Sequence, residues 1–212
     1  MRCPLKWITL ATGLALLGEA RGAIVHFPGE DIAIPSTYAG VSVDLETGAW
    51  STDLNGLAGG DANFFLGGSR VSNDAYAPST SPTWQPIRVG TGNTDAIVRL
   101  APGTTIDLDS EFYSTGFGAS GQINPHMGTA SGFTDGVAGY LGFSLVIGSS
   151  GNEQTVYGWA LVTFENNDGV GTLHSWAYED TGGAIQVGAV PEPTGGVLVL
   201  MAAAAGLLRR RC

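Results

Sequence analysis

Basic residues are scarce in this chain of 212 residues. Nine Lys and Arg stand against 19 Asp and Glu, for a formal net charge of −10, and Lys6 is the single lysine. This balance argues against non-specific binding to nucleic acid or anionic lipid, because both need a positively charged surface. Charged residues make up only 13% of the chain and hydrophobic residues 43%, which excludes a charge-rich disordered protein.

Cysteine is almost absent as well. Cys3 and Cys212 lie at the two ends of the chain, so the long segment between them has no thiol for a disulfide or for nucleophilic catalysis. Residues 23–189 hold three arginines against 17 acidic residues, a net charge of −14. This middle segment is therefore an acidic domain that must be stabilised by its core, or by a bound metal, without covalent cross-links.

Residues 1–22 have the three parts of an export signal. Arg2 and Lys6 form a basic start, and an apolar run follows at residues 7–17. The run fits the ~7–15 apolar residues of a signal peptide and is shorter than the ~20 residues of a membrane span. Small residues then offer two cleavage positions, after Ala20 and after Gly22. We expect export through the secretion translocon and removal of this segment; the alternative is an uncleaved anchor.

The last 23 residues contain a second three-part signal. Val190, Pro191, Glu192 and Pro193 precede a short apolar run at residues 197–208, which three arginines follow. The positive-inside rule keeps such arginines in the cytoplasm and places Pro-Glu-Pro just outside the membrane. A plain tail anchor would explain the run and the arginines, but not the Pro-Glu-Pro before them. The tail residues expected at the membrane are Val197, Leu198, Val199, Leu200, Leu207, Leu208, Arg209, Arg210 and Arg211.

This tail resembles the PEP-CTERM sorting signal. The resemblance implies recognition by exosortase, a membrane cysteine transpeptidase-like enzyme of Gram-negative bacteria that make exopolysaccharide. The segments Gly-Tyr-Leu-Gly-Phe at 139–143, Tyr-Gly-Trp-Ala at 157–160 and Trp-Ala-Tyr-Glu at 176–179 are similar to segments of the passenger domains that such proteins carry. The resemblance implies a secreted β-rich domain, held transiently at the inner membrane and then placed at the cell surface or in the extracellular matrix of a biofilm.

Residues 23–189 predict an all-β domain. Residues 41–46 alternate apolar and polar side chains, and residues 141, 143, 145 and 147 share one apolar face, as in half-buried strands. Residues 156–164 are apolar on both faces, which predicts a central strand, and 171–178 returns after a turn at 166–169. Many short strands with Gly and Asn turns predict a single β-sandwich of jelly-roll-like form, with a long loop near 110–135.

No catalytic constellation is evident. The three histidines lack zinc-ligand spacing, and His174 is expected as a packed or solvent-facing strand residue. Asp107, Asp109 and Glu111 would share one face of an extended segment, where they could bind calcium or act as paired carboxylates. The alternative is the solvated face of an edge strand. We therefore expect no enzyme activity and no cofactor, with calcium at this row as the one weak exception.

Aromatic residues are the remaining candidates for ligand contact, because their rings can stack on sugars. Trp159 and Trp176 fall in the best-patterned strands and are expected in the core. Trp84 lies close to Pro82 and Pro86, so we expect it to be exposed and to contact a ligand. We expect an exported structural or matrix protein. The alternatives are a carbohydrate-binding module for extracellular polysaccharide and a polysaccharide hydrolase or lyase with two convergent carboxylates.

Overall fold

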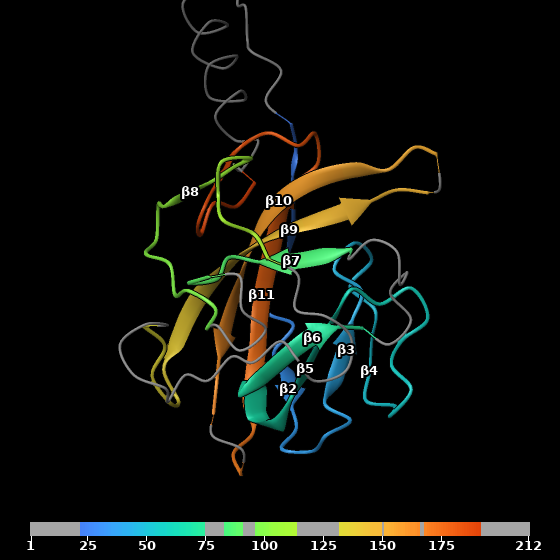
Figure 1. Ribbon diagram of the computed structural model, residues 1–212, viewed down its shortest axis with the longest axis vertical. Helices are drawn as coiled ribbons and strands as arrows, with labels where there is room; N and C mark the ends of the chain where they lie inside the picture. Colours follow the sequence, from blue (N-terminus) through green and yellow to red (C-terminus); the bar gives the residue numbers. More distant parts are fainter. Residues whose placement is uncertain are drawn as a thin grey trace, which may run out of the picture.

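The computed structural model describes residues 22–74, 83–90, 96–113, 132–149, 151–165 and 168–191. Within these ranges the regular elements are strands, apart from one 3-10 turn, η1 (Leu66–Gly68). The described strands form three antiparallel sheets, of which the two larger ones pack face to face (Figure 1). The all-β class and the β-sandwich architecture that the sequence predicts are confirmed.

The larger sheet is built around three long neighbouring strands that run up and down. These strands are β9 (Ala138–Ile147), β10 (Gln154–Thr163) and β11 (Gly171–Glu179). Shorter strands extend the sheet on both sides: β7 (Trp84–Pro86) pairs with β9, while β1 (Ile24–Phe27) and β2 (Ile32–Ile34) pair with opposite ends of β11. The central position that the two apolar faces of residues 156–164 predict is confirmed, because β10 lies between β9 and β11.

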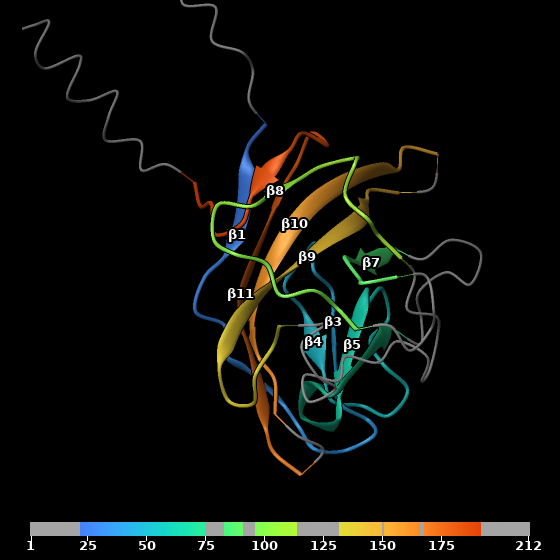
Figure 2. The same cartoon turned by 60° about the vertical axis from the view of Figure 1, so that its left-hand side comes forward.

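The smaller sheet has four strands in the order β4-β3-β5-β6. They are β3 (Val41–Val43), β4 (Trp50–Ser51), β5 (Ala62–Phe65) and β6 (Arg70–Asn73). A separate two-stranded ribbon pairs β8 (Thr105–Ile106) with β12 (Ile185–Gln186). Figure 2 shows the smaller sheet and β8 at different ends of the long strands.

Two apolar clusters explain why β10 has no polar face. Val156, Ala160 and Val162 point into the core between the two sheets, together with Leu141, Phe143 and Leu145 of β9. Trp159 and its neighbours on the other face pack against Ile106 of β8 and Ile185 of β12. The small ribbon thus covers the second face of the larger sheet, and burial on both faces accounts for the continuous apolar run.

A β-bulge interrupts the pairing of β10 with β11. Leu161 pairs with Ser175 and Val162 with Leu173, so His174 is the extra residue on β11. Its backbone oxygen accepts hydrogen bonds from the Glu30 and Asp31 N–H groups, at 3.0 and 3.4 Å. The bulge therefore fixes the segment between β1 and β2 against the edge of β11.

Candidate functional site

The two ends of the described domain meet at one pole of the sandwich. In Figure 2 the blue strand β1 lies beside the red end of the chain. Both segments line one pocket of about 770 Å³, whose walls include Gly22, Ala23, Val190 and Pro191. One candidate cleavage position of the export signal and the start of the sorting motif are therefore on the same surface.

Glu179 forms the acidic wall of this pocket. It ends β11 and is only 6% exposed. Its carboxylate accepts hydrogen bonds from Thr181 Oγ1 at 2.5 Å, from the Thr181 N–H at 3.1 Å and from the Gly183 N–H. A β-carbon on Gly22 would overlap Glu179 Oε1. The absence of a side chain at Gly22 is what lets the start of the domain lie against this carboxylate.

Asp180 ties the start of the domain to the end of β11. Its Oδ1 accepts a hydrogen bond from the Ala23 N–H at 2.8 Å, and its own N–H donates to the Ala23 oxygen at 3.1 Å. The next residue, Ile24, pairs with Glu179 in the first register position of β1. The chain is thus held in place from Ala23 onward.

The other end of the domain is fixed up to Ala189. The Ala189 oxygen accepts a hydrogen bond from Trp159 Nε1 at 3.0 Å. Beyond it, Val190 is 45% exposed and Pro191 is exposed. Glu192, Pro193, the membrane-tail residues 197–211 and Ala20 lie outside the described residues. In the part of the chain that is described, no helix is long and apolar enough to cross a membrane.

The expectation that Trp84 is an exposed ligand contact is wrong. Trp84 is 0% exposed and belongs to the main core, where its ring meets Phe64 edge-on at a centroid distance of 6.1 Å. Trp84 pairs with Leu145 on the edge of the larger sheet, and an edge strand tolerates proline because one side needs no N–H donor. Pro86 therefore belongs to an edge strand rather than to an exposed loop, and Pro82 lies outside the described residues.

The other tryptophans divide between core and surface. Trp159 and Trp176 are 3% and 0% exposed, which confirms their expected place in the core. Their indole N–H groups donate to backbone oxygens, whereas Trp84 Nε1 has no hydrogen-bond partner among the described residues. Trp50, on strand β4, is 52% exposed. Trp50 is thus the tryptophan in the described ranges whose ring can meet a ligand.

The predicted acidic row is a turn in the structure. Asp107 Oδ1 accepts hydrogen bonds from the Asp109 N–H at 3.1 Å and from Ser110 Oγ at 3.5 Å, an arrangement typical of Asx turns. The extended segment that would place Asp107, Asp109 and Glu111 on one face does not form. Within the described ranges, no group of three His, Cys, Asp or Glu side chains could hold a metal ion.

A second acidic group surrounds a buried carboxyl that sequence reasoning missed. Asp61 is 6% exposed, and its Oδ2 accepts a hydrogen bond from the Leu45 N–H at 2.8 Å. Burial raises the pKa of Asp61 to about 7, against the lowering effect of that hydrogen bond, and the nearby Asp44 adds to the rise. Burial, followed by the charge of Glu46, likewise raises the pKa of Tyr178. The pKa of this buried carboxyl is therefore raised toward neutral pH.

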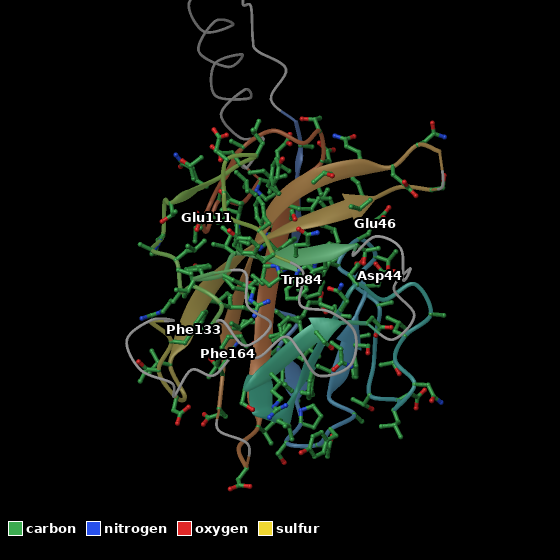
Figure 3. All side chains as sticks on the ribbon, in the orientation of Figure 1. Asp44, Glu46, Trp84, Glu111, Phe133 and Phe164 are labelled. Atoms are coloured by element: carbon green, nitrogen blue, oxygen red, sulfur yellow. The ribbon has the colours of Figure 1, made fainter. Side chains whose placement is uncertain are left out.

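The two acidic groups do not converge. In Figure 3, Glu111 lies at the left of the molecule, while Asp44 and Glu46 lie at the right. A glycosidase needs two carboxyl groups within about 10 Å of each other across a groove. These groups therefore do not combine into such a pair.

His174 lies at the centre of a line of polar side chains. Its Nδ1 is 2.7 Å from Asp31 Oδ1, and its Nε2 is 2.8 Å from Thr163 Oγ1. Asp31 has a left-handed backbone, with φ of 43°. The order carboxylate, imidazole, hydroxyl is that of hydrolase triads, but Thr163 stands in a middle strand paired with both Ala138 and Thr172. Nucleophilic hydroxyls of that class occupy exposed turns, so the line serves to join β2, β10 and β11.

Comparison with known proteins identifies no relative. No family model matches the chain, and no curated protein or solved structure matches it either. The resemblance of the tail to the PEP-CTERM signal therefore stays a prediction from the sequence.

Proposed function

We propose that the chain is an exported protein of the cell surface or extracellular matrix, sorted by an exosortase-type enzyme and without catalytic activity of its own. The observation that carries the proposal is the position of the chain ends. The domain is fixed up to Ala189, and the sorting motif emerges at the exposed Val190 and Pro191. This exit lies on the same pocket as Gly22.

The placement of the exit suits a membrane-bound sorting enzyme. Such an enzyme must reach the Pro-Glu-Pro motif while the passenger is already folded. The apolar run at residues 197–208 would hold the chain at the inner membrane before processing. Because the exit is at one pole, the rest of the sandwich can extend away from the membrane without blocking the motif.

The charge of the passenger fits an extracellular role. With three arginines against 17 acidic residues in 23–189, the domain repels other acidic surfaces and stays soluble. The same charge makes nucleic acid an unsuitable partner. The partners proposed are the secretion translocon, the sorting enzyme and the extracellular polymer around the cell.

The sorting role is tested with Glu192→Gln in the full chain, expressed in the native host. We expect a membrane-held precursor that retains Arg209, Arg210 and Arg211, because the sorting motif has lost its central charge. Cell fractionation and intact mass measure this. The control is Glu153→Gln, an exposed residue before β10, which should be processed like the unaltered protein. Normal processing of Glu192→Gln, or release of unaltered protein that keeps the arginines, would contradict the proposal.

Carbohydrate binding is a second candidate because Trp50 is exposed. Its ring, at 52% exposure on strand β4, can stack on a sugar. Trp50→Ala should then weaken retention of the protein on the host's extracellular polysaccharide, measured by co-sedimentation. Leu54→Ala removes a nearby side chain that is 78% exposed and serves as the control. Equal retention of both variants would exclude Trp50 as a sugar contact.

A further inference from the structure

The start of strand β1 distinguishes between the two candidate cleavage positions of the export signal. We infer that the exported domain begins at Ala23 and that its new α-ammonium group forms an ion pair with Asp180. This inference rests on the proposed export of the chain. It adds to that proposal a processing position and a structural role for the new chain end.

The nitrogen that cleavage would release is already at an acceptor. Ala23 N lies 2.8 Å from Asp180 Oδ1. Hydrolysis of the peptide bond between Gly22 and Ala23 consumes one water: its hydroxyl joins the Gly22 carbonyl carbon, and the Ala23 nitrogen leaves as an amine, protonated at neutral pH. One amide N–H then becomes an ammonium group with three donors. A charge-assisted hydrogen bond is roughly twice as strong as a neutral one.

The local charge favours an ammonium group at this pole. Glu179 and Asp180 are consecutive, and Glu179 is 6% exposed, so its negative charge is only partly screened by water. The three arginines of 23–189 lie elsewhere: Arg70 is in β6, Arg88 pairs with Ile97, and Arg99 donates to the Ala138 oxygen. The new chain end would bring a positive charge to a pole where, in the described structure, the Asp180 and Glu179 carboxylates accept hydrogen bonds from neutral N–H and O–H groups.

Gly22 explains why cleavage after this residue suits the fold. While it is present, Gly22 lies directly against the Glu179 carboxylate, where any β-carbon would overlap Oε1. Its departure removes the residue that now lies against this carboxylate. Gly22 and Ala20 also supply the small residues at the first and third positions before the cut, as in the A-x-A-like sites of signal peptides. Cleavage after Ala20 would instead leave Gly22 in place, so the Ala23 backbone N–H would remain the donor to Asp180.

The scarcity of lysine makes the inference testable by labelling primary amines. Lys6 is the single lysine, and it leaves with the export signal. The α-amine is then the sole primary amine of the exported protein, so an amine-specific reagent reports on this group alone. The full chain is expressed with its signal in an exporting host, and the product is analysed by intact mass and by labelling rate.

We expect a mass that begins at Ala23 and labelling about tenfold slower in the folded protein than in urea. Tenfold is the loss of reactive free amine that one unit of raised amine pKa produces. Asp180→Asn should bring the folded rate close to the rate in urea. Asp53→Asn, which alters an exposed residue in the turn after β4, should leave the protection unchanged.

The outcomes separate this inference from the function on which it rests. A product that begins at Arg21, or one labelled at the same rate folded and in urea, would overturn the inference while leaving export intact. A product that retains Lys6 gives a second labelled amine and would overturn export itself. If Asp180→Asn does not fold, the ratio of rates for the unaltered protein decides alone.

Discussion

Asp61 is the residue whose ionisation should matter most for stability. It is buried just before β5, with Asp44 and Glu46 nearby, and it accepts a hydrogen bond from the Leu45 N–H. A carboxylate at this position has lost most of its hydration and faces two like charges. The folded protein therefore holds a proton on Asp61 under conditions in which the unfolded chain releases it.

This retention predicts a pH dependence of unfolding. Burial raises the pKa of Asp61 from 3.8 to about 7. Below the lower value both states are protonated, and above the higher value both are ionised. Between them only the folded state keeps the proton, so its stability falls as the pH rises. The full loss is about 4 kcal/mol, from 1.36 kcal/mol per pKa unit.

Urea unfolding between pH 4 and pH 8 measures this effect, with Asp61→Asn as the comparison. The amide keeps an oxygen for the Leu45 N–H and does not ionise. We expect the variant to lose much less stability over this range and to exceed the unaltered protein at pH 8. Parallel curves for the two proteins would show that Asp61 is not the responsible group.

At the scale of elements, glycine determines how closely the long strands pack. A β-carbon on Gly158 of β10 would overlap the Phe143 ring and lie 2.5 Å from the Ala177 oxygen. Phe143 belongs to β9 and Ala177 to β11, so the contact spans three neighbouring strands. Glycine inside a strand usually weakens it, but here it makes room for a core ring.

Gly158→Ala should therefore destabilise the sandwich. The added methyl group must displace the Phe143 ring or spread the strands, which costs about 1–3 kcal/mol in typical cores. The control is Gly151→Ala, in the turn between β9 and β10, where no atom lies within 4 Å but φ is +89°. That change should cost about 1 kcal/mol from backbone strain alone. Urea unfolding compares them, and equal losses would show that crowding at Gly158 is unimportant.

The long strands could be predicted from sequence, and so could the short strand β3 within residues 41–46, but the short strand β7 was missed. The apolar patterns of β10 and β11 extend over nine or ten residues, enough to show their period and their burial. Strand β7 has three residues, and its pairing is supplied by β9, far along the chain. For Trp84 the nearby prolines were therefore the stronger local signal, and they led to the wrong expectation.

At the scale of the whole molecule, the meeting of the two domain ends at one pole could not be predicted. The residues that contact each other there are distant in sequence. Ala23 and Asp180 are 157 positions apart, and no local pattern shows that they meet. The export signal and the sorting tail are each encoded in a short stretch of sequence, so the sequence alone could suggest both. Asp61 was missed for a related reason, since its burial depends on the turn at Asp44 and on the packing of the two sheets.

The thin attachment of β12 has a mechanical consequence. Its two residues pair with Thr105 and Ile106, and the next residue, Val187, exchanges hydrogen bonds with Gly103 and Thr104, whereas β11 is held along its length on both sides. A pull applied at Pro191 would first break the bond between Trp159 and Ala189 and then peel β12 away. The freed segment from 181 to 191 adds roughly 40 Å of length, at ~3.3–3.6 Å per residue. In a domain tethered by this end, the C-terminal segment would therefore extend before the strands of the sandwich separate.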